Sequence, residues 1–123
     1  KHCVPCEGGV DPLDRKAAEG LLAQLHDEWS LNDAGTEIRR EFTFKGFYKT
    51  MGCVNAVAWI AIAEGHHPVL TIEYGKCHVS YTTHAIDGLS DNDFICAAKV
   101  DALPGAVRTM LGMTTLVEID TGE

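Results

Sequence analysis

The feature that most constrains this chain is a change of hydrophobic spacing near its middle. From Phe47 to Ala61 apolar side chains recur every three or four residues, which predicts one long helix. Gly65 and Pro68 follow this pattern and predict its end, because glycine favours helix ends and proline cannot continue a helix. Residues 76–83 alternate instead between apolar and polar side chains, as a half-buried strand does. The chain therefore combines helices and strands.

The remaining spacing patterns predict where the other elements lie. Helices are expected over 14–26 and 91–103, and strands over 36–44 and 69–74. Because helices and strands do not alternate one for one, we expect an α+β fold in which helices back one face of an antiparallel sheet.

The length of 123 residues and the apolar content of 46% suit a single compact domain. We place this domain at 14–103, after an N-terminal segment at 1–13. A tail at 104–123 follows, and its residues 115–119 are a candidate strand.

Charge and hydropathy exclude two classes of partner. The formal net charge is −8, whereas nucleic-acid binding relies on clustered Lys and Arg, so we expect no nucleic-acid partner. A basic cluster does occur, and we interpret it as a solvated strand and helix face. Its members are Arg39, Arg40, Lys45 and Lys49. No apolar run reaches the roughly 18 residues of a membrane span, so we expect no membrane partner.

The cysteines indicate a reducing compartment. Three of the five, Cys53, Cys77 and Cys96, lie in apolar periodic segments, where cysteine behaves as a small hydrophobic residue. No secretory signal pattern precedes them, and we expect a cytoplasmic protein, or an organellar one if a targeting peptide has been removed. Cys3-Val-Pro-Cys6 lacks the second half of a zinc site. Structural or incidental use is favoured over a metal shared between chains with His2.

Three histidines are candidates for chemistry at one edge of the sheet. His66 and His67 join the long helix to a strand, and adjacent side chains of extended backbone point to opposite faces. A hairpin with its turn near Gly75 brings His84 to the same edge. A three-histidine zinc site is one alternative, but adjacent histidines are poorly spaced for chelation. Acid–base catalysis, worth about 10²–10⁴-fold in rate, is favoured.

The sequence leaves two interpretations of the Asp93 carboxylate open. Ser90 and Asp93 have the spacing of a capping box, so the carboxylate serves the start of a helix. A carboxylate there also suits the orientation of His84. His26 and His78 have no partner by pattern and are interpreted as surface residues.

Four motifs, taken together in their order and spacing, resemble the pterin-4a-carbinolamine dehydratase family over roughly residues 14–103. They are Phe42-Thr-Phe44 with Phe47, Glu64-Gly-His66-His67-Pro68, Thr83-His84, and Gly88-Leu-Ser-Asp-Asn-Asp93-Phe. The start Cys3-Val-Pro-Cys6-Glu-Gly and the stretch Asn92-Asp-Phe-Ile-Cys-Ala-Ala-Lys99 are similar to the branch found in plants, protozoa and some bacteria.

The resemblance implies an enzyme that dehydrates 4a-hydroxytetrahydropterin to quinonoid dihydropterin and so recycles the cofactor of aromatic amino-acid hydroxylases. It implies neither a metal nor an organic cofactor. The family's active-site residues match His66, His67, His84 and Asp93. We expect His66 to be the principal acid–base group. His67 and His84 should position the pterin and share the proton transfer, and Thr83 should bind the pterin.

The resemblance also implies a four-stranded antiparallel sheet with three helices on one face, and homodimers or homotetramers. The extra strand is expected from residues 29–33. Val69 and Leu70 depart from the acidic and aromatic residues that many relatives carry after the proline. Members of this fold also act as non-catalytic modules, in transcription-factor dimerisation or Rubisco assembly. The presence of all three histidines and Asp93 favours the enzyme.

Overall fold

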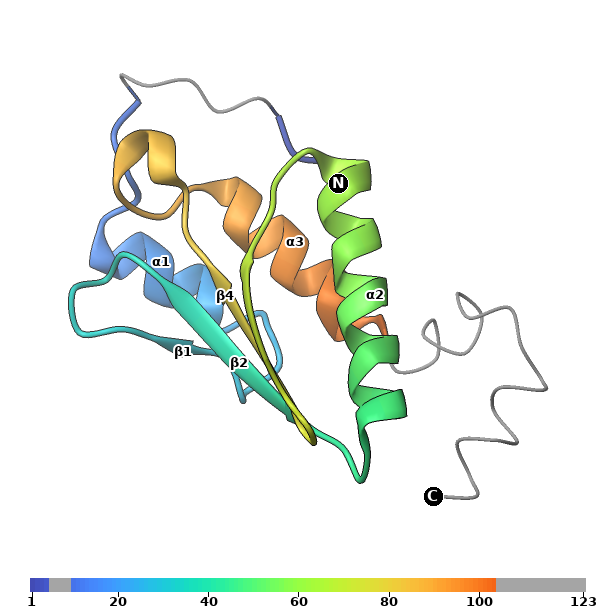
Figure 1. The fold of residues 1–123 in the computed structure, drawn as a ribbon. Helices are drawn as coiled ribbons and strands as arrows, with labels where there is room; N and C mark the ends of the chain where they lie inside the picture. Colours follow the sequence, from blue (N-terminus) through green and yellow to red (C-terminus); the bar gives the residue numbers. More distant parts are fainter. Residues whose placement is uncertain (5–9, 104–123) are drawn as a thin grey trace.

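A computed structural model describes residues 1–4 and 10–103 (Figure 1). The tail strand expected at 115–119 and the second cysteine of the C-x-x-C motif lie outside these residues. Along the chain the elements are α1 (Arg15–Leu22), β1 (Ser30–Leu31), β2 (Ile38–Thr43), α2 (Phe47–Glu64), β3 (Val69–Glu73), β4 (Lys76–Tyr81), a 3₁₀ turn (His84–Ile86) and α3 (Asp91–Asp101).

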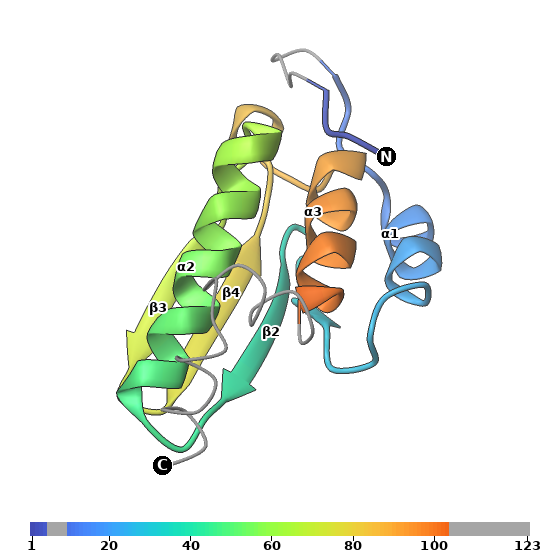
Figure 2. The ribbon, with the colours of Figure 1, turned by 90° about the vertical axis from the view of Figure 1, so that its right-hand side faces the viewer.

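The strands form one antiparallel sheet in the order β1-β2-β4-β3. Figure 2 looks onto the helical side of this sheet, where α2 lies over β3 and β4. The expected α+β fold, with four antiparallel strands and three helices on one face, is confirmed. The strand expected within residues 29–33 is also confirmed, because β1 pairs Ser30 with Arg39 and Leu31 with Ile38.

The core lies between the sheet and the helices, and the strands alternate as predicted. On β4 the inward residues Cys77, Val79 and Tyr81 are buried, and the residues between them are partly exposed. They pack against the buried face of α2 and the apolar side of α3. The three cysteines predicted to act as small hydrophobic residues are all buried in this core.

Arg40 corrects the interpretation of the basic cluster as a solvated face. Its side chain is only 10% exposed, and its Nη1 donates to Asp101 Oδ1 at 2.5 Å. The guanidinium also lies 4.3 Å from the ring centroid of Phe42. The reason is strand parity: residue 40 shares the helix-facing side of β2 with Ile38 and Phe42.

The first helix is shorter than expected. Asp14 caps α1 by accepting the Ala17 N–H at 2.8 Å, but the helix ends at Leu22 rather than at residue 26. The chain then turns because Asp101 of α3 accepts the His26 N–H at 2.9 Å and the Trp29 Nε1–H at 2.6 Å. These tertiary bonds outweigh the local helical pattern.

The other two helices begin and end close to where the sequence predicts. Gly65 closes α2 in the left-handed conformation, with φ 64°, and Ser90 precedes the first residue of α3. Within the part of the chain that the structure describes, no helix has the length and apolar character needed to cross a membrane.

Candidate active site

The end of α2 determines where His66 lies. The left-handed turn at Gly65 lets the His66 N–H bond back to the carbonyl oxygen of Ala61 at 3.1 Å. The imidazole then lies parallel to the ring of Tyr81, with centroids 5.8 Å apart and planes 10° from parallel. Its side chain is 11% exposed, so the ring is held inside the protein but remains within reach of solvent.

Asp93 is fully buried and holds three hydrogen bonds. Its Oδ1 lies 2.6 Å from His66 Nε2, and its Oδ2 accepts from Thr83 Oγ1 at 2.7 Å and from the Ser90 N–H at 3.0 Å. The carboxylate therefore closes the capping box of α3 and orients a histidine at once. The oriented histidine is His66, which corrects the reading that paired Asp93 with His84.

This arrangement decides which nitrogen of His66 carries a hydrogen in the neutral ring. An ionised carboxylate only accepts hydrogen bonds, so the Asp93 contact places the hydrogen on Nε2 and leaves a lone pair on Nδ1. Nδ1 is thus the nitrogen available to take up a proton. The His66–Asp93 pair can perform general base chemistry, and general acid chemistry once Nδ1 is protonated.

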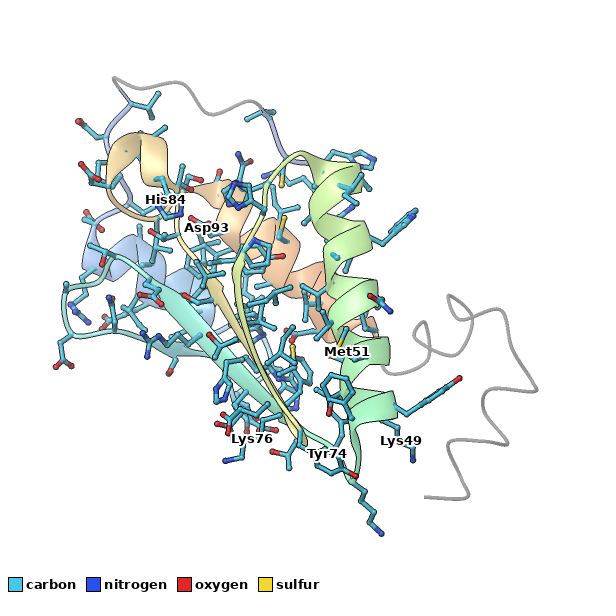
Figure 3. All side chains as sticks on the ribbon, in the orientation of Figure 1. Lys49, Met51, Tyr74, Lys76, His84 and Asp93 are labelled. Carbon is cyan, nitrogen blue, oxygen red and sulfur yellow. The ribbon has the colours of Figure 1, made fainter. Side chains whose placement is uncertain are left out.

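His67 and His84 form a second, exposed pair. Their ring centroids are 6.3 Å apart and their planes differ by 29°. The expected meeting of His84 with the adjacent histidines at one sheet edge is confirmed, and the neighbouring rings of His66 and His67 turn to different partners. Figure 3 shows His84 and Asp93 together at one end of the sheet, with Tyr74 and Lys76 at the other end.

The histidines differ in what surrounds them. A hollow of about 730 Å³ lies on the helix-free face of the sheet, and His84 borders it, whereas His66, His67 and Asp93 do not. Across residues 1–4 and 10–103, no group of three or more His, Cys, Asp or Glu side chains is arranged to hold a metal ion. The three histidines therefore fall into two groups. His66 is an internal ring bound to the Asp93 carboxylate, and His67 and His84 are an exposed pair.

The sequence alone does not identify two contributors to the site, Tyr81 and the backbone N–H of Ser90. The family resemblance assigns Thr83 to pterin binding, and the structure gives its hydroxyl other partners. Tyr81, which stacks on His66, looked like an ordinary core residue of an alternating strand. The Ser90 N–H bond to Asp93 was foreseen only as helix capping. Thr83 is buried, and its hydroxyl is engaged by Asp93 and Ser90. Its contact with a substrate stays a prediction.

Two histidines interpreted as unpaired have partners. His78 Nε2 lies 2.6 Å from Glu73 Oε2, and its Nδ1 lies 3.4 Å from Glu41 Oε1. These are cross-strand partners, because β4 lies between β2 and β3. His26 accepts the Glu28 N–H at 3.1 Å. Neither histidine contacts the candidate site through these bonds.

The features above define a class of protein: an α+β domain whose antiparallel sheet ends in a candidate acid–base site built from three histidines and one buried aspartate. A comparison of sequences narrows this class. The profile of the family described as pterin 4 alpha carbinolamine dehydratase matches residues 11–103, which span the whole sheet and all three helices. The chain belongs to the pterin-4α-carbinolamine dehydratase family.

Similar sequences carry the same family name. A protein from Nitrosomonas eutropha, named putative pterin-4-alpha-carbinolamine dehydratase, is 57% identical over 103 residues, covering 84% of this chain and 89% of that protein. A protein of the same name from Legionella pneumophila is 50% identical over 103 residues, covering 84% and 91%. These matches include the segment that holds all the candidate site residues.

Two solved structures share the fold. One, described as a transcriptional coactivator/pterin dehydratase from Brucella melitensis, superposes with a TM-score of 0.70 at 29% identity and covers 76% of this chain and 98% of its own. The other is described as a pterin dehydratase-like RuBisCO assembly factor of the alpha-carboxysome. It has a TM-score of 0.55 at 21% identity, covers 65% and 93% of the two chains, and shows similarity of fold alone.

Proposed function

We propose that this protein dehydrates 4a-hydroxytetrahydropterin to quinonoid dihydropterin, the step that returns a spent pterin toward the cofactor of aromatic amino-acid hydroxylases. Family membership and the names of the relatives support the reaction class. The observation that carries the proposal is the 2.6 Å contact between His66 Nε2 and the fully buried Asp93. A buried carboxylate that fixes one imidazole tautomer is an arrangement suited to proton transfer.

The reaction requires two proton movements. The N5–H and C4a–O bonds of the pterin break, a double bond forms between N5 and C4a, and the hydroxyl group leaves as water after it takes up a proton. His66 Nδ1 is the principal acid–base group, because Asp93 occupies Nε2 and the ring is only 11% exposed. A second imidazole completes the transfer, so that one group accepts a proton while another gives one.

His67 and His84 supply this second role and also position the substrate. Both rings are exposed and lie 6.3 Å apart, so a flat pterin ring has imidazole faces to stack on. Leu70, the second residue after the His-His-Pro motif, stands where many relatives carry an aromatic residue, and its side chain is partly buried against the core. It offers less stacking area than an aromatic ring, and we expect weaker pterin affinity here.

The direct test is stopped-flow decay of freshly generated 4a-hydroxytetrahydropterin with the wild type, His66→Ala, His67→Ala and His84→Ala. We expect His66→Ala to lose about 10²–10⁴-fold in turnover and the other two variants to lose less. His26→Ala, an exposed histidine without contact to the site, is the matched control and keeps full turnover. Equal losses in His66→Ala and His67→Ala would refute the division of roles, and a wild type no faster than buffer would refute the enzyme.

A second candidate function is that of a non-catalytic module, as in transcription or Rubisco assembly. The descriptions of the two similar structures favour its consideration, since one names a coactivator and the other an assembly factor. Such a role would leave His66 and Asp93 dispensable, so the same variants separate the two functions.

We further propose that the protein forms homodimers or homotetramers, because α2 carries exposed Trp59 and Ile62. We place it in the cytoplasm, or in an organelle if a targeting peptide is removed. The thiols at positions 3, 53, 77 and 96 are free in the described chain, which suits a reducing compartment.

A further inference from the structure

The C-x-x-C motif has no part in the proposed reaction, yet one of its thiols contacts the core. Cys3 Sγ lies 3.5 Å from Cys96 Sγ on α3. We propose that Cys3 and Cys96 are a redox modification site, which a small-molecule disulfide oxidises to a Cys3–Cys96 disulfide that fastens the N-terminal segment to α3. This inference goes beyond the dehydratase and does not depend on it.

Hydrogen bonds from α2 and α3 hold residues 1–4 in place. Asn92 on α3 pairs with Val4 in both directions: its Oδ1 accepts the Val4 N–H at 3.1 Å, and its Nδ2 donates to the Val4 carbonyl oxygen at 2.6 Å. Figure 2 shows the N-terminus beside the start of α3. The two thiols are thus brought together by contacts on either side of Cys3.

Glu64 at the end of α2 holds Cys3 from the other side. Its Oε1 accepts the Cys3 N–H at 2.8 Å, and its Oε2 accepts from Lys99 Nζ on α3 at 2.8 Å. Lys99 and His2 hold the pKa of Glu64 down at about 2, together with the Cys3 N–H. The carboxylate is therefore charged at neutral pH and ties three segments together.

The two sulfur atoms can reach bonding distance with little movement. A disulfide needs about 2.05 Å between sulfurs, so the pair must approach by about 1.5 Å. Cys96 is fully buried within α3, whereas Cys3 is partly exposed on a terminal segment. Cys3 therefore meets the oxidant and moves. Cys53 and Cys77 are both buried in the core, so they serve as reference cysteines that the oxidant should not reach.

The exchange balances with the small disulfide as oxidant. The Cys3 thiolate attacks one sulfur of the reagent, which forms a mixed disulfide and expels one reagent thiolate. Cys96 then attacks the Cys3 sulfur and expels the second. The two cysteine sulfurs lose two electrons, the reagent gains them and becomes two thiols, and the two cysteine protons end on those thiols.

The surroundings of the thiols make the exchange slow near neutral pH. Burial raises the pKa of the Cys3 thiol, and the Glu64 carboxylate raises it further against the opposing effects of Cys96 and Lys99. Burial also raises the pKa of Cys96, which faces Tyr81 on β4 and Cys3. Because only the thiolate attacks, the rate grows by up to about tenfold per pH unit below these pKa values.

The test uses the full chain and oxidised glutathione as the probe, at about pH 8.5 to raise the thiolate fraction. After free thiols are alkylated, trypsin releases peptides 2–15, with Cys3 and Cys6, and 77–99, with Cys77 and Cys96. We expect these peptides cross-linked, about 2 Da lighter than their sum because two hydrogens are lost. The cross-link persists in Cys6→Ser and Cys77→Ser and disappears in Cys3→Ser and Cys96→Ser.

Loss of the cross-link in Cys6→Ser or Cys77→Ser with retention in Cys3→Ser would overturn the assignment, as would a bond confined to peptide 2–15. If Cys96→Ser fails to fold, Cys3→Ser decides, because its side chain is partly exposed. Oxidation should also raise the thermal midpoint of the wild type by about 5–15 °C, since the bond closes a long loop. This rise in the thermal midpoint should be absent in Cys3→Ser. A cross-linked wild type without the rise would contradict the proposal that the disulfide fastens the N-terminal segment to α3.

Discussion

At the scale of single residues, Asp93 contributes both to the stability of α3 and to the proposed chemistry of His66. One oxygen caps α3 through the Ser90 N–H, and the other oxygen fixes the tautomer of His66. The carboxylate is fully buried, and all its partners are donors, so its charge is matched by hydrogen bonds rather than by water. A substitution that changes acceptors into donors must therefore disturb both roles.

Asp93→Asn tests this double role. The amide keeps the size of the side chain but turns an NH₂ group toward donors, so we expect a loss of about 1–3 kcal/mol in the free energy of unfolding. Turnover should fall by about 10²-fold or more with KM largely retained, because the wrong tautomer of His66 is favoured. Urea unfolding and steady-state kinetics measure the two effects separately.

Asp91→Asn is the matched control, because Asp91 lies exposed in the same first turn of α3. It should lose only the favourable placement of a negative charge near a helix start, about 0.3–1 kcal/mol, and keep its turnover. An equal fall in turnover for both variants would show that Asp93 acts through the stability of α3 and not through His66.

At the scale of elements, β2 shows how strand parity separates two neighbouring arginines. Arg40 points to the helices and binds Asp101, which also accepts hydrogen bonds from Trp29 and His26. Arg39 points to the helix-free face and binds Glu37 at 2.8 Å, with 68% of its side chain exposed. Asp101 thereby links α3, β2 and the turn after α1.

Replacement of each arginine by alanine should give contrasting results. Arg40→Ala leaves Asp101 without its charged partner in a largely buried place, and we expect a loss of about 2–4 kcal/mol in the free energy of unfolding. Arg39→Ala removes an exposed ion pair and should leave the midpoint of urea unfolding unchanged within error. Equal losses in the two variants would mean that the Arg40–Asp101 pair contributes no more to the free energy of unfolding than the exposed Arg39–Glu37 pair.

The sequence predicts the elements that rest on local patterns and misses what depends on distant partners. The spacing from Phe47 to Ala61, the Gly65 stop and the alternation of β4 depend on near neighbours, and each was predicted correctly. The early end of α1 depends on Asp101, about 75 residues further along the chain. The choice of His66 over His84 as the partner of Asp93 depends on how α2 packs beside α3, which no local pattern records.

At the scale of the whole molecule, the fold leaves apolar surface uncovered. Trp59 and Ile62 lie three residues apart on α2 and are 57% and 81% exposed. Val69 and Ile72 are exposed on β3, an edge strand of the sheet. Large apolar side chains grouped on one helix and beside an open sheet edge are typical of surfaces that bind another protein copy. The proposed homo-oligomer therefore has a helical surface and a sheet edge available.

The double variant Trp59→Glu/Ile62→Glu tests whether α2 is used for this association. Both side chains are exposed, so the charges should leave the fold intact but place repulsion across any symmetric contact, where the same surface meets itself. We expect a smaller mass by light scattering than for the wild type, with an unchanged circular dichroism spectrum. Lys16→Glu, at an exposed position of α1, shifts the net charge equally and should keep the wild-type mass. If the double variant also keeps that mass, α2 is not the interface, and the β3 edge becomes the surface to alter.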